Sequence, residues 1–173
     1  RGRETFRKME GPTAAQGILK ATAEKRIINS ASVPPEDCIF CKIAARGLTS
    51  YMVYEDETYM AFLDTTPFSK GHTLVCPKQH GETVWDMDGA EIGGLFALAS
   101  RISKAVVSVV DADGFRFVQN NGEAANQVVA HVHVHVIPVK LADKGRFMDR
   151  KRFTAEEMSS VAASIREKIA EVV

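Results

Sequence analysis

Cysteine is scarce in this chain: 3 of its 173 residues are Cys, at positions 38, 41 and 76. An odd number, with two of the three in a Cys-x-x-Cys pair, does not match the even disulfide framework of a small secreted domain. We therefore expect an intracellular protein, with a metal or redox role for the pair. The cytoplasm is the first expectation and the mitochondrion the alternative, because the acidic Glu4, Glu10 and Glu24 are atypical of a mitochondrial presequence.

An excess of charge of either sign is missing as well. The 22 Lys and Arg residues balance the 22 Asp and Glu residues, so the formal net charge is zero. This balance argues against bulk electrostatic binding to nucleic acid or to an anionic membrane. No apolar run in the sequence approaches the ~20 residues of a membrane span. We expect neither a nucleic-acid nor a membrane partner, and the 45% hydrophobic content suits one domain with a proper core.

Histidine is not abundant, with 5 residues, but three of them alternate with valine in the segment His131–Val136. In a β-strand, side chains two positions apart project from the same face. His131, His133 and His135 would therefore line one side, and the valines would face a core. An imidazole can act as nucleophile, proton carrier or metal ligand near neutral pH. Three of them on one strand face therefore indicate a functional site.

The rest of the pattern favours an α+β fold. Runs of β-branched and aromatic residues predict strands, and apolar residues at helical spacing predict two long helices. Asp37 would cap a short helix, and Thr154 and Glu157 form a capping box before the last helix. Short links between strands indicate a five-stranded antiparallel meander with helices packed on it. The predicted strands cover residues 51–55, 58–64, 71–76, 115–119 and 129–139, and the first long helix covers 88–110.

The N-terminal segment differs from the rest of the chain. Residues 1–36 are predicted to form an extension that is partly helical or disordered, with a helix over 13–29 and a Pro-containing linker over 30–35. Residues 37–173 would form the folded domain, including the C-terminal helix.

The Cys-x-x-Cys pair predicts a tetrahedral metal site, because four Cys and His ligands satisfy zinc. The candidate ligands are Cys38, Cys41, His80 and one member of the histidine triad. A thioredoxin-like redox pair is disfavoured because no βαβ pattern surrounds the two cysteines, and two core thiols are the remaining alternative. Cys76 follows apolar residues in a predicted strand, and we expect it to be a buried, inert thiol.

The polar loop before the triad predicts an anion site. Residues 120–127 offer amide donors, and Gly122 allows the backbone to approach a ligand closely. A neutral imidazole can attack phosphorus and hold it as a phosphoramidate, while neighbouring imidazoles bind oxygens and move protons. The loop and the triad together therefore indicate phosphate chemistry.

Several motifs resemble the histidine-triad (HIT) superfamily of nucleotide hydrolases and transferases, in that family's order. They run from about residue 38 to about residue 138, whereas residues 1–36 lie outside the resemblance and the region after 138 matches poorly. The motifs are Cys38–Ile43, Glu55–Glu57, Ala61–Asp64, Lys70–Val75, Pro77-Lys78-x-His80, Asn120–Glu123 and His131–Ile137.

The resemblance implies an assembly and roles for the histidines and cysteines. It implies a homodimer in which two five-stranded sheets form one ten-stranded sheet. His133 would be the nucleophile on the α-phosphorus of a nucleotide, assisted by His135 and His72. In zinc-containing, Hint-like relatives the metal ligands map to a structural zinc site made of Cys38, Cys41, His80 and His131.

The resemblance also implies a nucleotide pocket. Asp64 would accept the ribose hydroxyls of an AMP-like purine nucleotide. From the residues alone, Phe40 and Phe62 are core residues and Asp64 is a turn or cap residue. The residues implied around the purine are Ile39, Phe40, Ile43, Phe62 and Thr65, and those implied at the phosphate or leaving group are Asn120 and Gln127.

Two departures from the family pattern lie just before the triad. The family usually has Gly-Gln-Ser/Thr-Val, and this chain has Asn126-Gln127-Val128-Val129. Valine cannot donate a hydrogen bond, and losing a donor to developing charge could cost about 1–3 kcal/mol of transition-state stabilisation. We therefore expect activity with an altered leaving-group preference or a lower rate.

These features lead to a functional hypothesis with two alternatives. The first is a nucleotide hydrolase or nucleotidyl transferase that cleaves purine nucleoside 5′-monophosphate derivatives, such as phosphoramidates and acyl or sulfate adenylates, through a nucleotidyl-histidine intermediate. The alternatives are a dinucleoside polyphosphate hydrolase and a nucleotide-binding regulatory protein with weak catalysis.

Overall fold

A computed structural model describes residues 34–144 and 149–172. The chain divides into two units, residues 1–31 and 32–173, and the described residues all lie in the second unit. The helix predicted over 13–29 lies outside the described residues, as does the extension predicted for 1–36 except for its last three positions.

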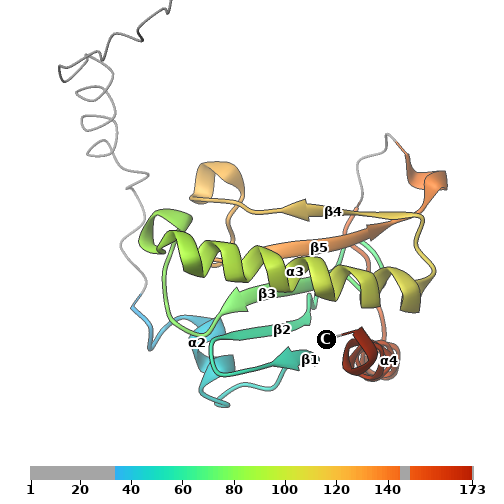
Figure 1. Cartoon of the computed structure of the whole chain (residues 1–173), viewed down its shortest axis with the longest axis horizontal. Helices are drawn as coiled ribbons and strands as arrows, with labels where there is room; N and C mark the ends of the chain where they lie inside the picture. The colour runs from blue at the N-terminus through green and yellow to red at the C-terminus, as the bar shows by residue number, and fades with distance from the viewer. Residues whose placement is uncertain (1–33, 145–148, 173) are drawn as a thin grey trace, which may run out of the picture. The chain divides into compact units, whose positions relative to one another are not determined.

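Five strands form one antiparallel sheet in the order β1-β2-β3-β5-β4 (Figure 1). The first three strands follow chain order, as a meander does, but β5 lies between β3 and β4. Helix α3 (Gly89–Val110) connects β3 to β4 at the edge of the sheet, and the chain then returns as β5 between these two strands. The α+β class and the five-stranded antiparallel sheet are confirmed. The strands are β1 (Met52–Glu55), β2 (Tyr59–Leu63), β3 (Thr73–Pro77), β4 (Gly114–Val118) and β5 (Val134–Val139).

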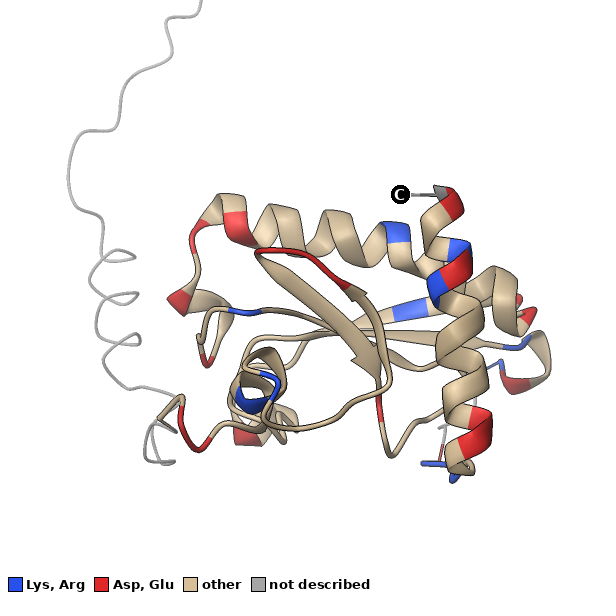
Figure 2. Cartoon of the chain, turned by 90° about the horizontal axis from the view of Figure 1, so that it is seen from below, with Lys and Arg blue, Asp and Glu red and all other residues tan. Residues whose placement is uncertain are grey.

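Helices α3 (Gly89–Val110) and α4 (Ala155–Val172) pack with one face of the sheet around the larger core. Val134 and Val136 of β5 are fully buried there, together with Ile102 and Ile165 of the two helices. Figure 2 shows that charged residues lie mainly on the helices and loops, while the strands are largely uncharged. The larger core is therefore apolar, as the alternation of valine with histidine predicts.

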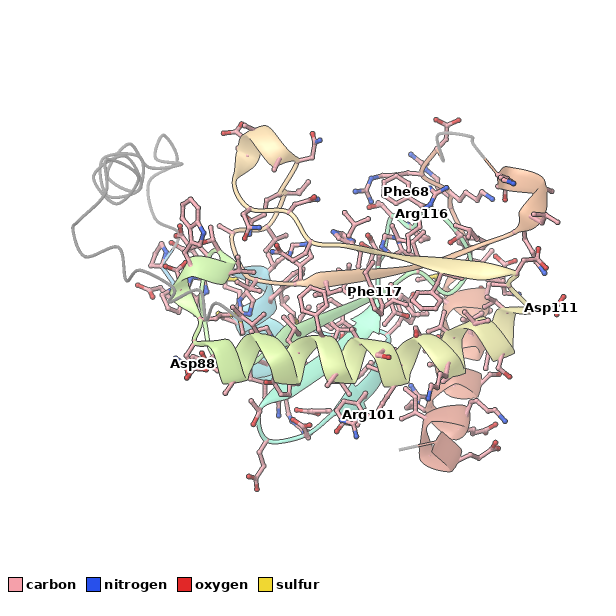
Figure 3. The ribbon with its side chains drawn as sticks, turned by 45° about the horizontal axis from the view of Figure 1, so that its top comes forward. Phe68, Asp88, Arg101, Asp111, Arg116 and Phe117 are labelled. Carbon is pink, nitrogen blue, oxygen red and sulfur yellow. The ribbon has the colours of Figure 1, made fainter. Side chains whose placement is uncertain are left out.

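The ends of the long helices follow the capping signals in the sequence. Asp88 accepts hydrogen bonds from the Ala90 and Glu91 amides at the start of α3, and the helix ends at Asp111 in the left-handed region (Figure 3). The amide of Glu157 donates to the Thr154 hydroxyl, which confirms the predicted capping box of α4. These bonds satisfy amides that have no partner inside a helix.

Helix α3 qualifies as a membrane span by length and composition alone. Its buried side chains, including Leu95, Leu98 and Ile102, pack into the larger core. The core helix of a soluble protein passes the same test, so this property is weak evidence for a membrane partner.

The opposite face of the sheet carries helix α2 (Ile39–Ala44) and a second core cluster. Phe40, Phe62 and Leu74 pack there. The prediction that Asp37 caps this helix is wrong, because the N-cap of α2 is Cys38 and no side chain makes a capping hydrogen bond there. Short 3-10 helices η1 (Val84–Asp86), η2 (Glu123–Ala125) and η3 (Leu141–Asp143) complete the described elements.

Strand β5 is shorter than the predicted strand over 129–139. It begins at Val134, so only the last of the three histidines lies within it. The preceding residues are held by other contacts, among them a hydrogen bond from the Val132 amide to the Gly81 carbonyl (2.7 Å). This bond is made to a loop and not to β3, which explains why the ladder stops before the first two histidines.

Candidate functional site

The three histidines of the HVHVHV segment lie together on the sheet face that helix α2 covers. His131, His133 and His135 are all buried, with at most 8% exposure. The Phe40 ring meets the rings of His131 and His133 edge-on, with centroids 5.7 and 5.3 Å apart. The prediction that the histidines share one face, opposite the valines, is confirmed.

His133 presents one nitrogen for chemistry. Its Nδ1 lies 2.6 Å from the His131 carbonyl oxygen, so Nδ1 carries the proton and donates. Nε2 then holds the lone pair, and it has no hydrogen-bond partner among the described residues. Burial is the main cause that lowers the pKa of His133 below its ordinary value. His133 is therefore a neutral imidazole with an available nitrogen nucleophile.

His72 and His135 form a hydrogen-bonded pair beside it. His72 Nε2 lies 2.9 Å from His135 Nδ1, and the Phe68 amide donates to His72 Nδ1 at 3.2 Å. His72 therefore donates through Nε2, which leaves the Nε2–H of His135 as an outward donor. Burial lowers the pKa of His72 to about 4 and that of His135 to about 3, so both rings are neutral at neutral pH.

Asp64 lies at the other end of this pair. Its Oδ2 is 3.5 Å from His72 Nδ1, and its Oδ1 accepts a hydrogen bond from the Thr66 amide (2.8 Å). Asp64 is therefore a turn residue, as expected from the residues alone. The implied role toward ribose stays a prediction.

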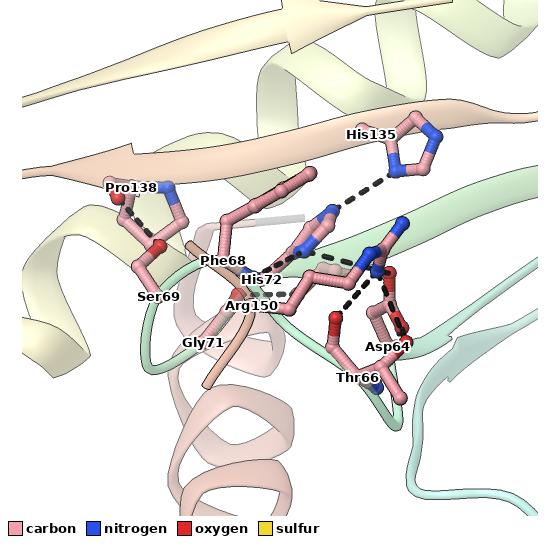
Figure 4. Close-up of polar contacts among 10 residues, drawn as sticks. Asp64, Thr66, Phe68, Ser69, Gly71, His72, His135, Pro138 and Arg150 are labelled. Carbon is pink, nitrogen blue, oxygen red and sulfur yellow. Dashed lines mark hydrogen bonds and ion pairs between the residues drawn. The ribbon is translucent and has the colours of Figure 1, made fainter. Parts of the chain in front are cut away.

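Arg150 is a site residue that sequence reasoning missed. Its Nη1 lies 3.4 Å from Asp64 Oδ2 and donates to the carbonyl and the hydroxyl of Thr66, while its guanidinium lies 4.6 Å from the centroid of the Phe68 ring. Figure 4 shows the side chain reaching between Asp64 and the His72–His135 pair. No local sequence signal pointed to it, because it lies 86 positions from Asp64 in the chain.

The second cluster of ligand-type side chains is Cys38, Cys41, His80 and His131. One ligand atom from each lies within 4.8 Å of every other, so the four could hold a metal ion. His131 Nδ1 is 3.5 Å from Cys38 Sγ and 3.6 Å from Cys41 Sγ, and His80 Nδ1 is 3.3 Å from Cys41 Sγ. The geometry thus selects His131 as the triad member that faces the thiols, which the spacing alone had left open.

The protein orients His131 for this role. Its Nε2 lies 2.9 Å from the Pro77 carbonyl oxygen, so Nε2 carries the proton and Nδ1 keeps its lone pair toward the thiols. Burial, and then the neighbouring Cys38, raise the pKa of Cys41 to about 11. Cys76 is fully buried with a raised pKa, in keeping with an inert thiol.

The residues implied around the purine are divided between core and surface. Phe40 and Phe62 are buried and meet edge-on at 5.2 Å, so they are core residues, as their types predicted. Ile39 is 46% exposed, Thr65 is exposed and Ile43 is half-buried. A contact of these residues with a purine remains a prediction.

The loop before the triad uses its polar groups internally. The Gln127 side chain accepts from the Gly122 amide and donates to the Glu82 carbonyl, each at 2.6 Å. Asn120 donates to the Asn126 carbonyl at 3.4 Å. Asn126 has φ 63°, which glycine and asparagine adopt with the least strain.

Val128 follows this loop, and its side chain is 83% exposed. Asn126 therefore preserves a backbone conformation suited to glycine, whereas Val128 offers no donor. The contacts predicted for Asn120 and Gln127 with a phosphate or leaving group stay predictions, since both amides are engaged within the protein.

Comparison with known proteins reveals relatives across this region. A family model described as HIT domain matches residues 46–141. The chain is 44% identical over 103 residues to "Protein hit" of Bacillus subtilis (strain 168), which covers 60% of this chain and 71% of that protein. It is 38% identical over 107 residues to "Adenylylsulfatase HINT3" of Arabidopsis thaliana, which covers 62% of this chain and 54% of that protein.

Solved structures are similar as well. A hypothetical histidine triad nucleotide-binding protein from Sulfolobus tokodaii strain7 has a TM-score of 0.72 at 39% identity, covering 78% of this chain and 93% of that chain. A zinc-bound histidine triad family protein from Mycobacterium smegmatis has a TM-score of 0.72 at 33% identity, covering 80% and 96%.

Proposed function

The chain belongs to the HIT family, and from this premise we propose that it hydrolyses purine nucleoside 5′-monophosphate derivatives through a nucleotidyl-histidine intermediate. The similarity to proteins named as nucleotide-binding and as an adenylylsulfatase supports this class of activity. The single observation that carries the proposal is the tautomer of His133, whose Nδ1 is tied to a carbonyl and whose Nε2 is available.

The proposed reaction has two displacement steps. His133 Nε2 attacks the α-phosphorus, and the bond to the leaving group breaks with its electron pair staying on that group. Water then attacks the same phosphorus and gives up a proton to solvent, the electron pair of the P–N bond returns to His133 Nε2, and the nucleoside monophosphate is released. The His72–His135 pair would donate to the phosphate oxygens as charge develops on them, and it has a donor available at His135 Nε2.

We further propose that Cys38, Cys41, His80 and His131 hold a structural zinc ion. Tetrahedral zinc with its usual Zn–S and Zn–N bond lengths places S and N atoms about 3.6 Å apart, and three such distances here are 3.3 to 3.6 Å. A relative is zinc-bound. The ion would tie the segment before β5 to helix α2 and so hold Phe40 against His133.

For the substrate, we propose an AMP-like nucleotide whose ribose hydroxyls meet Asp64 and whose base lies near α2 and β2. Because Val128 supplies no hydroxyl and the Gln127 amide is occupied, leaving groups that need little hydrogen-bonding help would react best. The same two observations favour a second candidate, a nucleotide-binding regulatory protein with weak catalysis.

We also propose a homodimer that joins two sheets at strand β4. This strand lies at one edge of the sheet, and its Phe115 and Phe117 are 44% and 36% exposed. An open strand edge with aromatic side chains is suited to pairing with a second copy of the chain.

Substitution of His133 tests the proposed reaction. His133→Ala should abolish turnover of adenosine phosphoramidate while AMP binding, measured by calorimetry, persists. Lys140→Ala, which removes an exposed cation paired with Asp111 on the surface, is the control and should behave as wild type. Turnover by His133→Ala near the wild-type rate would refute the mechanism, and nucleotide binding without turnover by the wild-type protein would favour the regulatory candidate.

A further inference from the structure

Arg150 is held by several contacts at the edge of the candidate active site. Its guanidinium lies on the Phe68 ring and its Nη1 contacts Asp64 and Thr66. The next residue is also fixed, because the Lys151 amide donates to the Pro67 carbonyl at 2.6 Å. A cation placed this way is preorganised, so it can bind a ligand with little further loss of conformational entropy.

The guanidinium is partly exposed and has unused donors among the described residues. Among the described residues, Arg150 makes its hydrogen bonds through Nη1, and neither Nε nor Nη2 has a partner there. The Arg150 side chain is 43% exposed and the Asp64 side chain only 11%. A solute that approaches from the solvent therefore meets the cation before the carboxylate.

A cation is a less suitable ligand for this place than an anion. Asp64, His72 and His135 lie close enough to one another to hold a metal ion. However, His72 Nε2 and His135 Nδ1 are already hydrogen-bonded to each other, and Asp64 Oδ2 is paired with Arg150. A metal would have to break these contacts and approach a guanidinium, whereas an oxyanion would add to them.

We propose that Arg150 is a specificity-determining residue that binds a second anionic group of the nucleotide, a phosphate or sulfate distinct from the reacting phosphorus. The planar fork of a guanidinium matches such tetrahedral oxyanions. This inference rests on the proposed function for the identity of the nucleotide. Two sources of the anion share this chemistry, namely a phosphate ester on the ribose and an anionic leaving group.

Binding of matched nucleotides to the full chain tests the proposal by calorimetry. The probes are AMP, adenosine 3′,5′-bisphosphate, adenosine 2′,5′-bisphosphate and, in a His133→Ala background, adenylyl sulfate. Arg150→Ala should weaken at least one of the doubly anionic probes about tenfold or more while AMP changes less than about twofold. Arg150→Lys keeps the charge and should recover part of that affinity, and Arg46→Ala, an exposed arginine paired with Glu55, should change nothing.

The outcomes separate the two sources and the two proposals. If Arg150→Ala weakens the binding of the bisphosphates alone, the result supports a ribose phosphate as the anion that Arg150 binds. If it weakens the binding of adenylyl sulfate alone, the result supports an anionic leaving group. Equal weakening of AMP and all other probes, or no weakening of any probe, overturns the role of Arg150. Because binding is read without turnover, absence of hydrolysis by the wild-type protein would refute the proposed reaction and leave this comparison valid.

Discussion

Burial of a neutral His72 should make the protein less stable in acid by a measurable amount. The pKa of His72 falls from 6.5 to about 4, chiefly through burial. The unfolded chain therefore binds the proton more readily than the folded one, and stability is lost as the pH falls from about 6.5 to about 4. A pKa lower by about 2.5 in the folded state lets His72 contribute at most about 3 kcal/mol to the free energy of unfolding. About 2 kcal/mol of this contribution is lost between pH 7 and about pH 5.

Urea unfolding at a series of pH values measures this effect. His72→Asn removes the titrating group, so the difference in unfolding free energy between wild type and variant should shrink by about 2 kcal/mol from pH 7 to about pH 5. Ser69→Ala is the control, because it removes a non-titrating hydrogen bond to the Pro138 carbonyl from the same loop. A wild-type-minus-His72→Asn difference that does not vary with pH would refute the reasoning.

Further predictions concern the metal, the core and the sheet edge. Cys38→Ser should abolish stoichiometric zinc in the purified protein, measured by elemental analysis, whereas Cys76→Ala should retain it. Phe40→Ala should lower the unfolding free energy by about 3–5 kcal/mol, measured in urea, because a buried ring is lost beside His133. Phe117→Asp should convert the proposed dimer to monomer in sedimentation, and a wild-type protein that sediments as a monomer would contradict the assembly.

Much of the fold follows from local patterns. Helix α3 begins after Asp88, as its side chain and apolar spacing predict, and the hairpin of β1 and β2 follows the β-branched runs on either side of an acidic turn. The predicted start of strand β5 at residue 129 was wrong, because its ladder with β3 begins only at Val134. Local propensity cannot show that the Val132 amide bonds to the Gly81 carbonyl of a loop instead of to β3.

The sequence by itself determined which histidines and cysteines are candidates for the chemistry. Alternation of histidine with valine is a local property, since strand-like backbone sends neighbouring side chains to opposite faces wherever the strand lies. Cys38 and Cys41 are likewise neighbours in sequence. The predicted roles for these residues needed no knowledge of the tertiary structure.

Only the tertiary structure decided the contacts between distant segments. It selected His131 to face the thiols, 93 positions from Cys38, and it placed Arg150 against Asp64. It also tied the Gln127 amide to a loop 45 positions away. Such pairings depend on the order of strands in the sheet, because β5 between β3 and β4 brings these segments together. No periodicity within one segment encodes that order.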